Sequence, residues 1–167
     1  MNLRVPMRTV AIRVRLPDDT MHRIHLKGPW EFQPLSQRSA AVGVPLPAGG
    51  TIKFPAAWRD FLGDFAGCVR FTRHFNLPTN LEPRDQVDLV LDGLGGTAEI
   101  RLNQVPVGMV QPPDQTGRFD ITPLLRPHNI LEISLEWNGT ATGSGGLWAP
   151  VALEIFEGEQ RRVPAID

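Results

Sequence analysis

The sequence predicts an all-β fold, an antiparallel β-sandwich built as a single domain. Apolar and polar residues alternate with a period of two in several segments, which is typical of strands with one face on a core and the other in water. Glycine and proline number 16 each in 167 residues, and such frequent turn formers favour many short strands. No long segment keeps a 3.6-residue period and no β-α-β alternation occurs, so two packed antiparallel sheets are expected.

Five segments show the alternation most clearly. They are 86–94, 98–103, 105–110, 130–137 and 151–156. In the first, Val87, Leu89 and Leu91 share one face while Asp88 and Asp92 share the other. The second and third predict a hairpin that turns at Asn103-Gln104. We expect the outward acidic residues to be solvated rather than catalytic; they are Glu99, Glu132, Glu136 and Glu154.

Other segments give weaker signals. Segment 67–77 alternates, but Arg73 breaks its phase, which either a bulge or an inward functional arginine would explain. Segment 10–16 is a candidate outer strand. Around 120–129, Thr122 can cap a helix, Pro123 suits its first position and Pro127 ends it, so about one turn is expected.

The domain prediction is one unit over residues 1–167, with its core at about 24–157. Segment 36–57, spaced by prolines and glycines, is expected to be a long surface connection. The tails 1–8 and 158–167 are expected to be the least anchored parts.

Charge and composition exclude several classes of protein. The net charge is −1, with 17 basic and 18 acidic residues well mixed along the chain, which argues against nucleic-acid and membrane-surface partners. The sequence shows no signal peptide and no apolar run of about 20 residues, so we expect a soluble, cytoplasmic protein. Cys68 is the only cysteine, and a packed thiol is favoured over a nucleophile.

No catalytic or metal-binding residue is predicted. His22 and His25 lie three apart on a predicted strand, so their side chains would point to opposite faces and could not share a metal. Asp120 is expected to serve a turn or cap.

The segment TATGSGGLWAPVALEIF, residues 140–156, combines glycines with Trp148. A phosphate-binding loop would need a helix after it, whereas a strand is predicted on each side. A linker would need a further domain after it. A loop at the end of the sandwich remains, and such loops often carry binding sites.

Sugar binding needs an exposed aromatic plate with a few fixed polar groups. Trp30 and Trp137 lie in strand contexts that favour core packing, whereas Trp58 and Trp148 lie in loop contexts. The predicted sugar-binding residues are therefore Trp148, Asn138 and Trp58.

Several motifs occur in one order along the chain. They are LKGPWEF, FTRHFNLP, VDLVLDGLGGTAEIRLNQVPVG, GRFDITPLLRPHNILEISL and GGLWAPVALEIF. Together they resemble the N-terminal sugar-binding domain of family 2 glycoside hydrolases, the group of β-galactosidases, β-glucuronidases and β-mannosidases. The resemblance implies a jelly-roll-like sandwich of the galactose-binding type over about 24–157. One departure is Asn103-Gln104, where the family has Asn-Gly.

The resemblance also shapes the functional expectation. In that family a later barrel supplies the two catalytic glutamates, and the sequence ends at Asp167 without such a segment. The favoured hypothesis is a non-catalytic carbohydrate-binding or accessory module. The alternative is a protein-interaction domain that docks on a separate catalytic chain or self-associates, and a small glycoside hydrolase is less favoured. No cofactor is expected, although a structural calcium held by backbone carbonyls is compatible with the resemblance.

Overall fold

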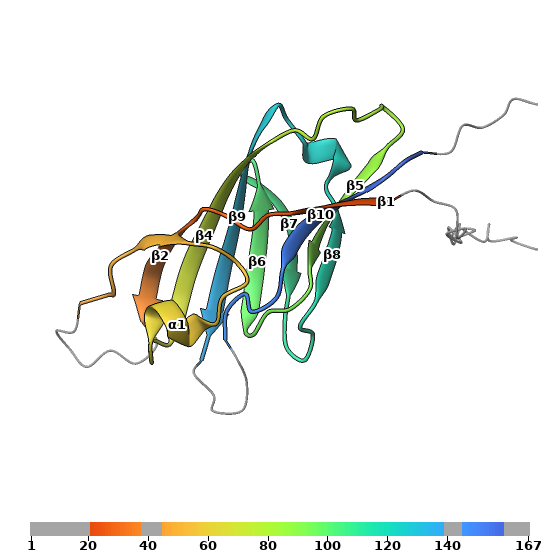
Figure 1. Ribbon diagram of the computed structural model, residues 1–167. Helices are drawn as coiled ribbons and strands as arrows, with labels where there is room; N and C mark the ends of the chain where they lie inside the picture. The colour runs from red at the N-terminus through yellow and green to blue at the C-terminus, as the bar shows by residue number, and fades with distance from the viewer. Residues whose placement is uncertain (1–20, 38–44, 139–144, 159–167) are drawn as a thin grey trace, which may run out of the picture.

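The computed structural model, which describes residues 21–37, 45–138 and 145–158, is a sandwich of two antiparallel sheets (Figure 1). The predicted fold class is confirmed. The elements are β1 (Met21–His25), β2 (Trp30–Gln37), β3 (Gly50–Ile52), α1 (Trp58–Leu62), β4 (Gly67–Asn76), β5 (Gln86–Leu91), β6 (Thr97–Leu102), β7 (Val105–Val110), β8 (Gly117–Asp120), η1 (Thr122–Leu124), β9 (His128–Trp137) and β10 (Val151–Phe156).

The two sheets differ in size. The four-stranded sheet has the order β1-β10-β5-β8, and the six-stranded sheet has the order β3-β2-β4-β9-β6-β7. Sequence neighbours are thus often separated in space, and β4 pairs along its whole length with β9. The core between the sheets is formed by the apolar faces that the alternation predicts, and it includes Trp30 and Trp137 as expected.

The hairpin predicted at Asn103-Gln104 is present between β6 and β7. Asn103 has φ 51° and Gln104 has φ 69°, the two consecutive positive values that a type I′ turn requires. Replacing the family's usual Asn-Gly by Asn-Gln therefore leaves this turn in place.

The broken phase at Arg73 has a clear structural cause. The register between β4 and β9 is continuous from Gly67 opposite Trp137 to Asn76 opposite His128, so a bulge at this position is excluded. Arg73 therefore lies on the same face of β4 as Phe71 and Phe75, which pack in or against the core. It is a charged residue at an apolar position of the alternation, and it lines a cleft at the edge of the core. Of the two explanations, the inward arginine is correct.

Other local predictions need correction. The helical turn spans Thr122–Leu124, but its cap position is Ile121, without a side-chain cap bond. The Thr122 hydroxyl instead bonds to Asp120 Oδ1 (2.6 Å), and the Thr122 N–H donates to the same oxygen (3.0 Å), so Asp120 serves the turn as predicted. The surface connection predicted over 36–57 contains β3 and the end of β2.

Some predictions fall on residues that the structure does not describe. These are the outer strand 10–16, the tail 1–8 and nearly all of the tail 158–167. In the described part of the chain, no helix has the length and apolar character needed to cross a membrane.

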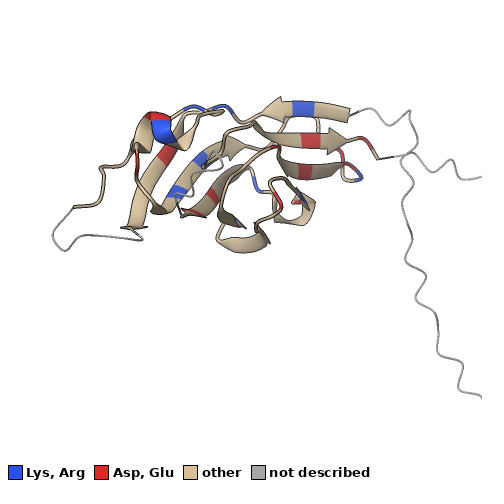
Figure 2. Ribbon diagram, turned by 90° about the horizontal axis from the view of Figure 1, so that it is seen from below, with Lys and Arg blue, Asp and Glu red and all other residues tan. Residues whose placement is uncertain are grey.

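Glu154 is not solvated, which corrects the expectation for this residue. It is 5% exposed and accepts hydrogen bonds from Arg23 (2.7 Å) and Arg118 (2.6 Å). Arg118 also contacts Asp88 (3.1 Å). These residues come from four neighbouring strands, β1, β10, β5 and β8, and Figure 2 shows charged residues in adjacent strands of this sheet. The outer face of the four-stranded sheet thus carries a network of ion pairs.

This network predicts a loss of stability in acid. The hydrogen bond from Arg118, reinforced by Arg23, holds the pKa of Glu154 below its ordinary value despite burial. A carboxyl group whose pKa is lower in the folded state stabilises the fold above its unfolded pKa of about 4.3, and that stabilisation is lost as the pH falls through the folded pKa. We expect Glu154→Gln to show a smaller drop in Tm than the wild type between pH 7 and pH 3, measured by circular dichroism. Equal drops in the two proteins would contradict this.

Candidate functional site

The described part of the glycine-rich segment, which begins at Gly145, lies at one end of the sandwich. Gly146 and Gly95 exchange backbone hydrogen bonds of 3.3 and 2.9 Å, and the Trp58 N–H donates to the carbonyl of Gly145 (3.3 Å). Three segments that are distant in sequence therefore meet here: the start of α1, the loop before β6 and the approach to β10. Residues 145–150 of the predicted loop lie at this end of the sandwich, whereas its residues 139–144 lie outside the described residues.

The glycines in this segment serve close packing. A Cβ atom on Gly145 would lie 2.3 Å from Cδ2 of the Trp137 ring, and one on Gly93 would lie 2.6 Å from Cη2 of Trp148. Both distances are shorter than any real contact, so the two rings lie directly on glycine backbone. The glycines thus explain how two tryptophans fit at one end of the sandwich.

Of the two predicted aromatic site residues, Trp148 is the one that the structure presents to solvent. It is 39% exposed, and Cη2 and Cζ3 of its six-membered ring lie against Gly93. The backbone on either side of it is fixed, because Ala56 N–H donates to Leu147 O (3.3 Å) before it and Ala149 N–H donates to Gly93 O (3.3 Å) after it. This arrangement gives an aromatic ring on a fixed backbone, packed against Gly93 and partly open to solvent, which is suited to stacking against an apolar face of a ligand.

The other two predicted site residues lie in different surroundings. Asn138 is exposed directly after β9 and has an interaction partner. Trp58 is the first residue of α1 rather than a loop residue, and it is 1% exposed. Its Nε1–H donates to the carbonyl of Phe65 (2.6 Å). Trp58 therefore offers no open face to a ligand, and it supports the end of the sandwich from within the core.

The described residues offer neither a reactive thiol nor a metal site that would be a second candidate functional site at this end of the sandwich. Burial raises the pKa of the Cys68 thiol, which fits a packed thiol because the thiolate is the nucleophilic form. Among the described residues, no group of three or more histidine, cysteine, aspartate or glutamate side chains is placed to hold a metal ion. The structural calcium allowed by the resemblance stays a prediction.

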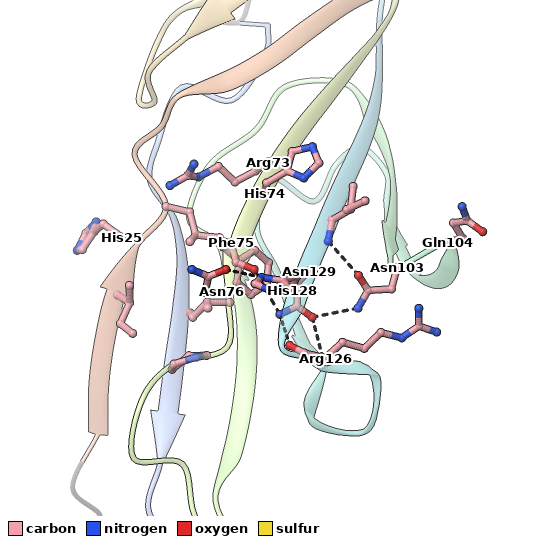
Figure 3. Close-up of a pocket in the computed structure, with 15 residues that line it drawn as sticks. His25, Arg73, His74, Phe75, Asn76, Asn103, Gln104, Arg126, His128 and Asn129 are labelled. Atoms are coloured by element: carbon pink, nitrogen blue, oxygen red, sulfur yellow. Dashed lines mark hydrogen bonds between the residues drawn. The ribbon is translucent and has the colours of Figure 1, made fainter.

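A second hollow lies at the opposite end of the six-stranded sheet (Figure 3). It is a cleft of about 740 Å³ whose lining comes from β1, β4, β10 and the segments around Asn103 and Asn129. One wall is held by a closed hydrogen-bond network in which Asn103 Nδ2 donates to Asn129 Oδ1 (3.0 Å) and to Leu124 O (3.0 Å). In the sequence, the only indication of this cleft is Arg73, a charged residue at an apolar position of the alternation. The walls of the cleft come from segments far apart in the chain, so no local pattern predicts them.

Comparison of the sequence with known protein families gives one match, which covers part of the β-sandwich. Residues 68–142 match the family of glycosyl hydrolase 2 galactose-binding domain-like proteins. The matched region runs from β4 through β9 and includes the hairpin at Asn103-Gln104. The resemblance seen in the sequence motifs is confirmed, and the chain is related to the N-terminal domain of family 2 glycosidases.

Solved structures with the same fold include several β-glucuronidases. The Bifidobacterium dentium enzyme, complexed with coumarin-3-O-glucuronide, is 18% identical with a TM-score of 0.68, and the match covers 85% of this chain and 31% of that enzyme. An uncultured Clostridium β-glucuronidase is 18% identical with a TM-score of 0.67, covering 86% and 30%. The Bacteroides uniformis enzyme is 21% identical with a TM-score of 0.63, covering 81% and 18%.

The chain thus spans about a third or less of the length of these enzymes. At these identities the likeness establishes the fold alone. No curated protein matches the chain.

Proposed function

We propose that this domain is a non-catalytic carbohydrate-binding or accessory module whose ligand stacks on Trp148. The observation that carries the proposal is the rigid, outward-facing ring of Trp148 on the backbone of Gly93. The family match of residues 68–142 supports it, because that family is described as galactose-binding domain-like. Asn138, exposed at the end of β9, is the proposed polar partner.

The chemistry of sugars fits such a surface. A pyranose presents an apolar face of C–H groups bordered by hydroxyls, so an aromatic ring takes the face while nearby polar groups take the hydroxyls. A supported ring loses little conformational freedom when the ligand binds, and this preorganisation favours affinity.

The test is a thermal-shift screen against mono- and oligosaccharides of galactose, glucuronic acid and mannose, with and without calcium. Ligand at ten times its Kd stabilises the fold by about 1.4 kcal/mol, a shift of about 3–6 °C for a chain of this size. We expect a selective shift that is lost in Trp148→Ala and largely kept in Trp148→Phe, which preserves an aromatic plate. The absence of any shift across the panel would contradict the proposal.

A specific observation favours a protein-docking role as the second candidate. β7 is an edge strand of the six-stranded sheet, and its Val105 and Met109 are 38% and 49% exposed. Unpaired edges with exposed apolar side chains are suited to pairing with another chain. If this role holds, light scattering will show self-association that Met109→Lys abolishes. A strictly monomeric wild type would exclude self-association.

A further inference from the structure

Arg73 is placed where a core residue would be expected. It follows Phe71, which is fully buried, and precedes Phe75, which packs against the core. Its guanidinium reaches from β4 towards the connection between β1 and β2, where Nη1 donates to the Pro29 carbonyl (3.2 Å). Figure 3 shows this side chain at the upper side of the cleft.

No residue that the structure describes forms an ion pair with Arg73. Four other arginines form ion pairs with carboxylates, namely Arg23, Arg84, Arg101 and Arg118. Arg73 forms none with any residue that the structure describes, and its buried Nε has no hydrogen-bond partner there. A guanidinium has five N–H donors, so most of its bonding capacity is unused. A buried donor without a partner is costly, so a ligand oxygen that accepts from Nε would stabilise this arrangement.

The rest of the described lining carries no negative charge. Its described lining includes Arg126 and the histidines 25, 74 and 128, and it includes no aspartate or glutamate. In Figure 3 Arg126 points away from Arg73, so the two do not form a single clamp. Arg126 instead contributes to the positive potential of the region. The cleft is therefore electropositive on a chain whose net charge is −1.

The surface beside Arg73 is apolar. Ile24 pairs with Leu153 across β1 and β10, so the two side chains share the inner face of the four-stranded sheet. Leu153 is buried there, whereas Ile24 is 40% exposed at the open edge. Phe75 contributes an aromatic surface from the opposing sheet. A cation thus borders an apolar patch that is accessible from solvent.

We propose that this cleft binds an anionic saccharide, with its carboxylate or sulfate on Arg73 and its C–H face on Phe75 and Ile24. Guanidinium groups bind such oxyanions through charge-assisted hydrogen bonds. The volume of about 740 Å³ accommodates a saccharide of one or two rings. This site is separate from the Trp148 surface, since the two lie at opposite ends of β9, and it adds a second ligand class to the domain.

The experiment is a titration of the full chain followed by NMR or calorimetry. The probes are a uronic acid disaccharide, a sulfated disaccharide, a neutral disaccharide and inorganic sulfate. We expect one or both acidic disaccharides to bind, and the affinity to fall as sodium chloride is raised from 50 to 300 mM. The comparison of the two acidic probes identifies which oxyanion is preferred. Binding of the neutral disaccharide or of inorganic sulfate as tight as that of the acidic disaccharides would overturn the proposal.

Variants connect the binding to the cleft. Arg73→Gln should weaken acidic-disaccharide binding at least tenfold, whereas Arg70→Gln, which removes the same charge from the exposed face of β4, should change it less than twofold. If Arg73→Gln does not fold, Ile24→Glu tests the same site by placing a carboxylate at the exposed edge, and it should also weaken binding at least tenfold. Trp148→Ala should leave this binding intact, which separates it from the sugar stacking proposed above. Unchanged affinity in a folded Arg73→Gln or in Ile24→Glu would exclude the cleft.

Discussion

Replacing Trp58 by alanine is expected to lower the free energy of unfolding by about 3–5 kcal/mol, as large-to-small changes of buried aromatic residues do. The ring stacks on Phe65 with centroids 6.1 Å apart and packs edge-on against Trp137 at 5.5 Å. The substitution also removes the hydrogen bond from Nε1 to the Phe65 carbonyl. A large cavity and an unsatisfied carbonyl would result together.

Trp148→Ala is the matched control, because it removes the same side chain at the same end of the sandwich from an exposed position. We expect it to cost less than about 1.5 kcal/mol, since its ring buries less apolar surface. Urea unfolding followed by circular dichroism measures both variants. Equal losses in the two would show that Trp58 contributes no more to the core than Trp148 does, contrary to the structure.

The contrast between these tryptophans shows what periodicity can predict. Trp30 and Trp137 lie in strands, where alternation assigns a face, and both are buried as predicted. Trp58 begins a helix of five residues, which is too short to show a helical period. Its burial depends on Phe65, Trp137 and Gly146, which come from other parts of the chain. Local pattern alone therefore could not distinguish it from Trp148.

The charged residues show a second limit of the same kind. Alternation correctly places Glu154 on the outer face of its strand, but burial on that face depends on neighbours. Arg23 and Arg118 come from strands more than 30 residues away in sequence, and they cover Glu154 from either side. The order of strands that brings them together, β1-β10-β5-β8, is not encoded in any one segment.

Arg73 is the case in which a local irregularity was informative. Its break in the apolar alternation left two explanations, and only the pairing of β4 with β9 could decide between them. The cleft beside it is assembled from separate strands and turns, so its size and the lack of carboxylates in its described lining emerge only in three dimensions. A residue that departs from a regular pattern thus marked the position of a cleft without indicating its shape.

Asn129→Ala is the second substitution for which a large effect is expected, a loss of about 2–4 kcal/mol in the free energy of unfolding. Asn129 is 1% exposed, and its side chain makes two hydrogen bonds with the backbone of Arg126. Its Oδ1 accepts from the Arg126 N–H (2.8 Å), and its Nδ2 donates to the Arg126 carbonyl (2.7 Å). Its Oδ1 also accepts from Asn103 Nδ2 (3.0 Å). Alanine would leave these buried groups without partners, at about 1–3 kcal/mol for each unsatisfied group.

Asn76→Ala is the control for this substitution, because Asn76 is exposed and its side chain bonds only to His128 (2.8 Å) among the contacts described. We expect it to cost less than about 0.5 kcal/mol, as surface substitutions usually do. A double-mutant cycle adds a sharper test. Asn103 and Asn129 share a hydrogen bond, so the losses in Asn103→Ala and Asn129→Ala should not add in the double variant, and a coupling of about 0.5–3 kcal/mol is expected. Strict additivity in urea unfolding would show that the two asparagines stabilise the wall of the cleft independently, and the network described here would then be wrong.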